Sequence, residues 1–142
     1  MYYEKIRNFE VLTKRFGEWP AFHDAEIISL SLYRKDGVNH MPKMELRIHH
    51  FQTTSETAAK GYFKQIKHSL TTFCFHLVEG LELEGFDYQN VVYNLDIKDI
   101  SDDQAGNSKF QVEIEPSSGL SCFFICKEIE ILDSIEIDAD SV

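Results

Sequence analysis

The sequence lacks any run of about 18 apolar residues, the length that a helix needs to cross a membrane. Its first residues, MYYEKIRNFE, also lack the basic, apolar and small-residue order of a secretory signal peptide. We therefore expect a cytoplasmic protein with no membrane partner.

Basic residues are scarce, because 14 Lys and Arg stand against 24 Asp and Glu, which gives a net charge of −10. An acidic chain repels phosphate backbones, and this argues against nucleic acid as a partner. Charge complementarity favours a basic protein partner instead.

Cysteine is limited to three residues, Cys74, Cys122 and Cys126, and all three lie in apolar, strand-like segments. Their odd number and setting are typical of reduced thiols. Cys122 and Cys126 are about 13 Å apart if they share a strand, which is too far for a disulfide or a shared zinc ion.

Known motifs of metal and cofactor sites are also missing. The sequence has no HxH, HExxH or CxxC spacing for zinc, and no GxGxxG, P-loop or GxSxG motif for dinucleotides, nucleotides or serine hydrolysis. We therefore expect no metal, no cofactor and no enzymatic activity of these kinds.

Apolar residues are nevertheless plentiful. With 43% hydrophobic residues in 142, the chain can bury one core, and no linker or repeat divides it. We therefore expect a single domain over residues 1–142.

Residues 4–16 predict an amphipathic helix, because apolar side chains recur there at the helical period. Gly17 follows and can end that helix in the left-handed conformation. The apolar stripe comprises Tyr2, Ile6, Phe9, Leu12 and Phe16.

The rest of the chain alternates with the period of strands. A turn joins the first two predicted strands into a hairpin, and the last strand begins near Leu120 and runs past residue 131. The predicted strands are 25–34, 44–51, 66–78, 91–97, 110–114 and this last one, with loops or turns at 52–60, 101–107 and 116–119. The fold class is therefore α+β, with an N-terminal helix packed on a mainly antiparallel, twisted sheet of about six strands in one or two layers.

Charge is segregated along the chain. Up to Val78 there are 8 acids and 11 bases, whereas from Glu79 onward there are 16 acids and 3 bases. The acids of the second part could form a docking surface for a basic protein, or they could simply solvate the outside of a sheet without any partner. The candidate partner-binding residues are Asp99, Asp102, Asp103, Glu113, Glu115, Glu128 and Glu130.

His23 and Asp24 are the one pair that is placed for chemistry, on a loop that enters a strand beside Trp19 and Phe22. Neighbouring residues entering a strand point to opposite faces, so we expect these two side chains not to bond with each other, which weakens a catalytic dyad. Two interpretations remain. In a structural corner, Asp24 caps turn amides and His23 bonds to backbone above Trp19 and Phe22. Alternatively, a pocket near Trp19, His23 and Asp24 binds or hydrolyses a small ligand.

Residues 19–27, WPAFHDAEI, resemble the immunity protein 50 family of bacterial polymorphic-toxin systems, whose members carry a WPxFHDAE-like stretch before a hydrophobic strand. Three further segments look similar to that family. They are Gly85-Phe86 with residues 89–92, the turn at 115–119 and the strand at 123–131.

This resemblance implies a small cytoplasmic α+β protein that binds a cognate toxin domain and blocks it without chemistry of its own. It also implies that His23 and Asp24 are signature positions, and it leaves open whether they contact the toxin or hold the fold. The acidic composition agrees with a basic toxin as the partner.

Overall fold

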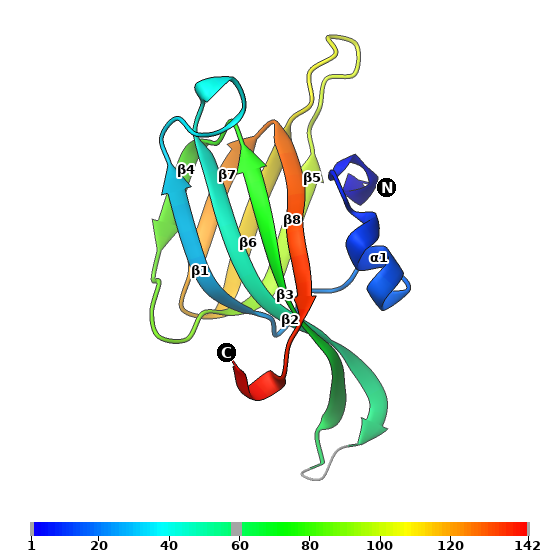
Figure 1. Ribbon diagram of the computed structural model, residues 1–142. Helices are drawn as coiled ribbons and strands as arrows, with labels where there is room; N and C mark the ends of the chain where they lie inside the picture. The colour runs from blue at the N-terminus through cyan, green and yellow to red at the C-terminus, as the bar shows by residue number, and fades with distance from the viewer. Residues whose placement is uncertain (1, 58–60, 142) are drawn as a thin grey trace.

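The computed structural model describes residues 2–57 and 61–141, in which eight antiparallel strands form one open sheet (Figure 1). The order across the sheet is β4-β7-β6-β5-β1-β2-β3-β8. The strands are β1 (Glu26–Tyr33), β2 (Lys43–Thr57), β3 (Phe63–His76), β4 (Glu79–Glu84), β5 (Val91–Asp99), β6 (Phe110–Ser118), β7 (Ser121–Cys126) and β8 (Glu128–Glu136).

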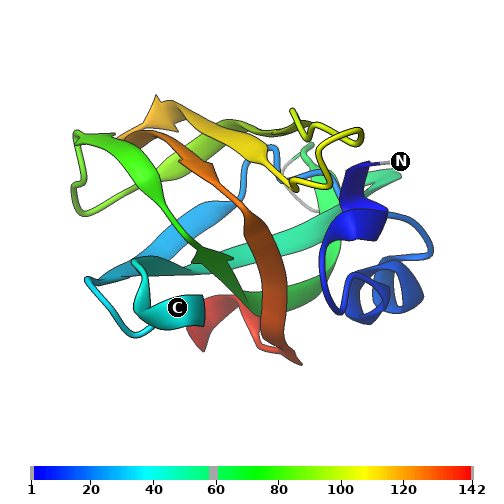
Figure 2. The same cartoon turned by 90° about the horizontal axis from the view of Figure 1, so that it is seen from above.

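The sheet curls so that its two halves face each other across the core. Seen from above, β1, β2 and β3 lie on one side of the interior and β5 and β6 lie on the other (Figure 2). The fully buried rings of Phe75 in β3 and Phe124 in β7 meet edge to face, with 4.9 Å between centroids. Apolar residues from both halves therefore share one core.

The hairpin of β1 and β2 and the buried faces of several strands are as predicted. Met44, Leu46 and Ile48 of β2 point into the core, as do Phe110 and Val112 of β6. The predicted loop at 101–107 is also present.

The predicted loop at 52–60 is wrong over 52–57, because this polar segment continues β2: its pairing with β3 runs on beyond the core, and Gln52 lies opposite Ile66. Residues 58–60 of that predicted loop lie outside the described residues. The predicted count of about six strands is wrong for two reasons. The predicted last strand is divided at Lys127 into β7 and β8, while β4 adds a strand in a segment that periodicity leaves unassigned.

The division at Lys127 also exchanges the buried face. Even-numbered residues such as Cys122 and Phe124 are buried in β7, whereas the odd-numbered Ile129 and Ile131 are buried in β8. β7 pairs with β6 and β4, and β8 pairs with β3 at the other edge of the sheet. A one-residue offset in a strand exchanges its two faces. This exchange at Lys127 lets the chain pass from β7 to β8 at the other edge of the sheet while apolar side chains of both strands stay in the core.

The N-terminal helix predicted over 4–16 is also wrong in extent. The segment forms a 3₁₀ helix, η1 (Tyr2–Lys5), and a short α-helix, α1 (Glu10–Phe16), and Gly17 ends α1 with a φ of 82° as predicted. Between them, the backbone of Arg7 pairs in parallel with β8 through N···O distances of 2.9 Å to Ile129 and Ile131. The edge of β8 offers backbone N–H and C=O groups that Arg7 pairs with, and this pairing interrupts the helix that the apolar period predicts.

Two further short 3₁₀ helices complete the described part, η2 (Val38–His40) and η3 (Ala139–Ser141). No helix in residues 2–57 and 61–141 has the length and apolar content that crossing a membrane would require.

Candidate functional site

The corner before β1 is packed on aromatic rings. Trp19 stacks on Tyr3 with parallel planes and 5.3 Å between centroids, and it contacts Phe22 edge to face at 6.0 Å. Phe22 is buried and lies 5.7 Å from Phe73 of β3. The two aromatic residues of the corner therefore anchor it to the core.

His23 and Asp24 join the corner to β5. His23 Nδ1 lies 2.8 Å from the carbonyl oxygen of Tyr93, and the backbone N–H of Asp24 donates to the carbonyl of Val92 at 2.9 Å. The expected bond from His23 to backbone is therefore present.

The expectation that these two side chains point to opposite faces is wrong, although no hydrogen bond joins them within the described residues. His23 Nε2 lies 3.5 Å from Asp24 Oδ1, and both side chains are more than half exposed. The reason is that Asp24 has a φ of 67°, so the corner is a left-handed turn there and not yet a strand with alternating faces. Within the described part of the chain, the Asp24 carboxylate accepts no hydrogen bond from a turn amide, so the predicted cap is wrong.

A hollow of about 390 Å³ lies beside this corner. His23 and Asp24 line it together with Phe16, Glu18, Pro20, Ala21, Phe51, Gln52 and Thr53. Nδ1 of His23 faces the carbonyl of Tyr93 at 2.8 Å, and Nε2 faces the Asp24 carboxylate at 3.5 Å. Thr53 is the one hydroxyl residue of the lining, and no hydrogen bond joins it to His23 within the residues described.

The seven predicted partner-binding acids do not come together in one place. Asp99, Asp102 and Asp103 lie at the end of β5 and in the loop that follows. Lys5 Nζ is 2.6 Å from Asp99 and 3.7 Å from Asp103. Hydrogen bonds from Lys5 and Ser101 lower the pKa of Asp99 to about 2. Asp102 accepts hydrogen bonds from two backbone N–H groups of its own loop. Asp99 and Asp103 therefore hold η1 through Lys5, and Asp102 closes the turn of its own loop.

Glu128 and Glu130 lie on β8, where Arg7 neutralises part of their charge. Arg7 Nη1 is 3.3 Å from Glu130 Oε2, and Arg7 Nη2 is 3.7 Å from Glu128 Oε2. The other oxygen of Glu130 lies 2.7 Å from His76 Nε2. These two acids therefore belong to the contact between β8, β3 and the N-terminal segment.

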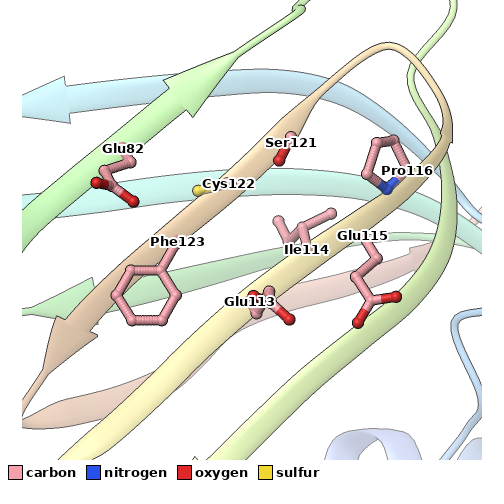
Figure 3. Close-up of a pocket in the computed structure, with 8 residues that line it drawn as sticks. All are labelled: Glu82, Glu113, Ile114, Glu115, Pro116, Ser121, Cys122 and Phe123. Atoms are coloured by element: carbon pink, nitrogen blue, oxygen red, sulfur yellow. The ribbon is translucent and has the colours of Figure 1, made fainter.

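Glu113 and Glu115 lie on the outer side of β6, where β4 adds Glu82 (Figure 3) and β5 adds Asp96. The register of β5 and β6 sets Asp96 opposite Glu113, and Phe123 of β7 lies opposite both Glu113 and Glu82 of β4. We call these five residues, Glu82, Asp96, Glu113, Glu115 and Phe123, the acidic face.

The acidic face is short of cations. Lys98 lies 3.7 Å from Asp96, whereas Glu82, Glu113 and Glu115 have no ion pair within residues 2–57 and 61–141. Four of the five residues, all but Asp96, border a hollow of about 490 Å³ with Ile114, Pro116, Ser121 and Cys122 (Figure 3). Uncompensated carboxylates around a half-buried aromatic ring favour contact with a positively charged side chain.

Sequence reasoning missed Glu82 and Asp96 as members of this face. Asp96 alternates visibly with apolar neighbours, but the register that sets it opposite Glu113 depends on bulges near Val92 that no local pattern encodes. Glu82 lies in the segment that periodicity leaves unassigned.

The comparisons with known proteins agree with the resemblance in the sequence. The family model described as immunity protein 50 matches residues 8–136. Neither the curated proteins nor the solved structures include a match to this chain. Because the family match spans nearly the whole chain, from just before α1 to the end of β8, this protein belongs to the immunity protein 50 family.

Proposed function

We propose that this protein neutralises a cognate bacterial toxin domain by binding it through the acidic face. Family membership supports a role as an immunity protein. The observation that carries the choice of surface is the set of three carboxylates, Glu82, Glu113 and Glu115, that have no cation beside them in the described residues. The expected partner is a toxin with a basic surface.

The arrangement of this face is costly for the sheet alone. Like charges directly opposite each other on paired strands are destabilising, and Asp96 faces Glu113 in this way. A surface that served only solubility would need no such pairing, because the same charges could be spaced apart. A basic partner would reduce the repulsion between Asp96 and Glu113 on binding, and this supports a role of the pair in binding.

Affinity requires more than charge. Exposed charges mainly set the association rate and the choice of partner, whereas buried aromatic anchors supply most of the binding energy. Phe123 is half-buried at the centre of the acidic face and is placed to serve as such an anchor.

The proposal requires a toxin domain encoded in a neighbouring reading frame, and the test uses that domain. Association with that domain is measured by stopped flow over a series of salt concentrations. The native chain is compared with the triple variant Glu82→Gln, Glu113→Gln, Glu115→Gln. A matched triple variant, Glu10→Gln, Glu56→Gln, Glu136→Gln, removes the same net charge at exposed positions elsewhere.

We expect the acidic-face variant to associate about tenfold or more slowly at low salt and to lose most of its salt dependence. The matched variant should stay close to the native chain. Equal behaviour of the two variants would show that net charge alone matters and would remove the acidic face from the proposal. Absence of any binding to the neighbouring toxin would contradict the proposed function itself.

A further inference from the structure

A thiol, an imidazole and a carboxylate meet where β3 pairs with β8. Cys74 Sγ lies 3.4 Å from His76 Nε2, and His76 Nε2 lies 2.7 Å from Glu130 Oε1. The three donor atoms all lie within 4.8 Å of one another. Cys74 and His76 are two residues apart in one strand, so they share a face, and Glu130 is the cross-strand partner of Cys74. The sheet itself therefore holds the three donors together.

We propose that Cys74, His76 and Glu130 bind one zinc ion, with water in the fourth position. One sulfur, one nitrogen and one oxygen ligand, with an open fourth position, is a set that zinc accepts in tetrahedral geometry. The site is separate from the acidic face and does not depend on toxin binding.

The distances suit such an ion. Ordinary zinc bond lengths of about 2.3 Å to sulfur and about 2.0 Å to nitrogen and oxygen place tetrahedral ligands roughly 3.5 Å apart for S and N and roughly 3.3 Å apart for N and O. The separation of Cys74 Sγ and His76 Nε2 already matches the first value. Glu130 Oε1 has to move away from His76 by about 0.6 Å and to lie roughly 3.5 Å from Cys74 Sγ, from which it is at most 4.8 Å away.

The surrounding charges also fit a divalent cation. Arg7 binds Glu130 through Oε2, which leaves Oε1 to face the ion and fixes the orientation of the carboxylate. Glu45 and Glu128 add two acids nearby, and Lys43 adds one base. With Cys74 as a thiolate, four negative and two positive groups leave two negative charges for the ion to neutralise.

Binding moves two protons. The Cys74 thiol releases its proton to solvent when sulfur becomes a ligand. His76 must carry its ring proton on Nδ1 to bind through Nε2, and the N–H of Val38 then gives up its 3.4 Å contact with Nδ1. That contact is long for a hydrogen bond, so its loss costs little, and bonds to zinc replace the 2.7 Å contact between His76 Nε2 and Glu130 Oε1.

Sequence reasoning passed over this site because its ligands do not follow a single motif. The spacing C-x-H at residues 74–76 is visible, but Glu130 comes from a strand more than fifty residues away and is brought in only by the pairing of β3 with β8.

The test uses the full chain, freed of metal with a chelator, and titrates it with zinc alone and with cobalt alone. Zinc binding is followed by calorimetry and by Tm, and cobalt binding by absorption spectroscopy. We expect one zinc per chain, a higher Tm with zinc, and a thiolate-to-cobalt charge-transfer band together with the intense visible bands of tetrahedral cobalt. Cys74→Ser should abolish the charge-transfer band and weaken zinc binding by at least about tenfold.

Cys122→Ser is the matched control, since Cys122 is equally buried but lies on β7, and it should keep the band and the affinity. His76→Gln is the second ligand variant and should also weaken zinc binding. If a variant fails to fold, the zinc stoichiometry and the cobalt spectrum of the native chain still test the proposal. A native cobalt spectrum without the charge-transfer band, or with the weak bands of octahedral cobalt on surface carboxylates, would overturn the proposal.

Discussion

Glu113→Gln should stabilise the isolated protein while it weakens the proposed docking surface. In the native chain, Glu113 lies directly opposite Asp96, and Phe123 separates Glu113 from Glu82 on the other side. A like-charge pair opposite each other on antiparallel strands is destabilising, and we take about 0.2–1 kcal/mol, the size of an ordinary cross-strand pair interaction, as the upper range, because Lys98 lies 3.7 Å from Asp96 and offsets part of the repulsion. Removal of one charge should therefore raise the free energy of unfolding by about that amount, which corresponds to a rise in Tm of roughly 1–4 °C for a chain of this size.

The assay is urea unfolding of the native chain and of Glu113→Gln, followed by circular dichroism at low and at high salt. The gain should be largest at low salt and should shrink as salt screens the repulsion. Glu136→Gln is the control, because the cross-strand partner of Glu136 is the uncharged Ser69. A loss of stability in Glu113→Gln at low salt, or an equal gain in Glu136→Gln, would refute the reasoning from cross-strand repulsion.

Three further outcomes follow from the geometry of the core and the corner. Burial lowers the pKa of His50 from 6.5 to about 3, so between these pH values the unfolded chain binds a proton that the folded chain does not. The free energy of unfolding should therefore fall as the pH drops through this window, by up to about 1.4 kcal/mol per pH unit. Urea titrations at several pH values should show a smaller dependence of the free energy of unfolding on pH in His50→Gln than in the native chain. Phe124→Ala should cost about 3–5 kcal/mol in urea unfolding because Phe124 is fully buried against Phe75, whereas Ile125→Ala, at a half-buried neighbour, should cost clearly less. His23→Ala should lower the free energy of unfolding by about 1 kcal/mol, because the bond to the Tyr93 carbonyl is lost, and it should leave the association rate with the toxin unchanged. A slower association at unchanged stability would instead show that the corner belongs to the docking surface.

The alternation of apolar and polar residues was sufficient to predict a strand and its buried side where the strand has one buried face and one solvated face. The strands around Met44, Leu46 and Ile48 and around Phe110 and Val112 were predicted because alternation alone sets which side is inside. The same rule failed at Lys127. Odd-numbered apolar residues continue on both sides of it, and the exchange of faces depends on which strand each half pairs with.

The candidate site was harder to predict than the fold. Acids close in the sequence, such as Glu113 and Glu128, lie on different strands at different parts of the sheet, whereas Asp96 and Glu113 become neighbours only through strand register. His23 and Asp24 illustrate the opposite error. Sequence reasoning kept them apart as strand residues, and the left-handed backbone at Asp24 brings them to 3.5 Å.

The segregation of charge along the chain has a structural use as well as the proposed one. The basic first part and the acidic second part meet at the surface of the fold, where Lys5 pairs with Asp99, and Arg7 pairs with Glu128 and Glu130. Those acids hold the N-terminal segment against β5 and β8, so their removal should loosen that segment before it affects any partner. Glu82 of β4 and Glu113 and Glu115 of β6 have no such cation within the described residues, and their charge is then left to act on another molecule.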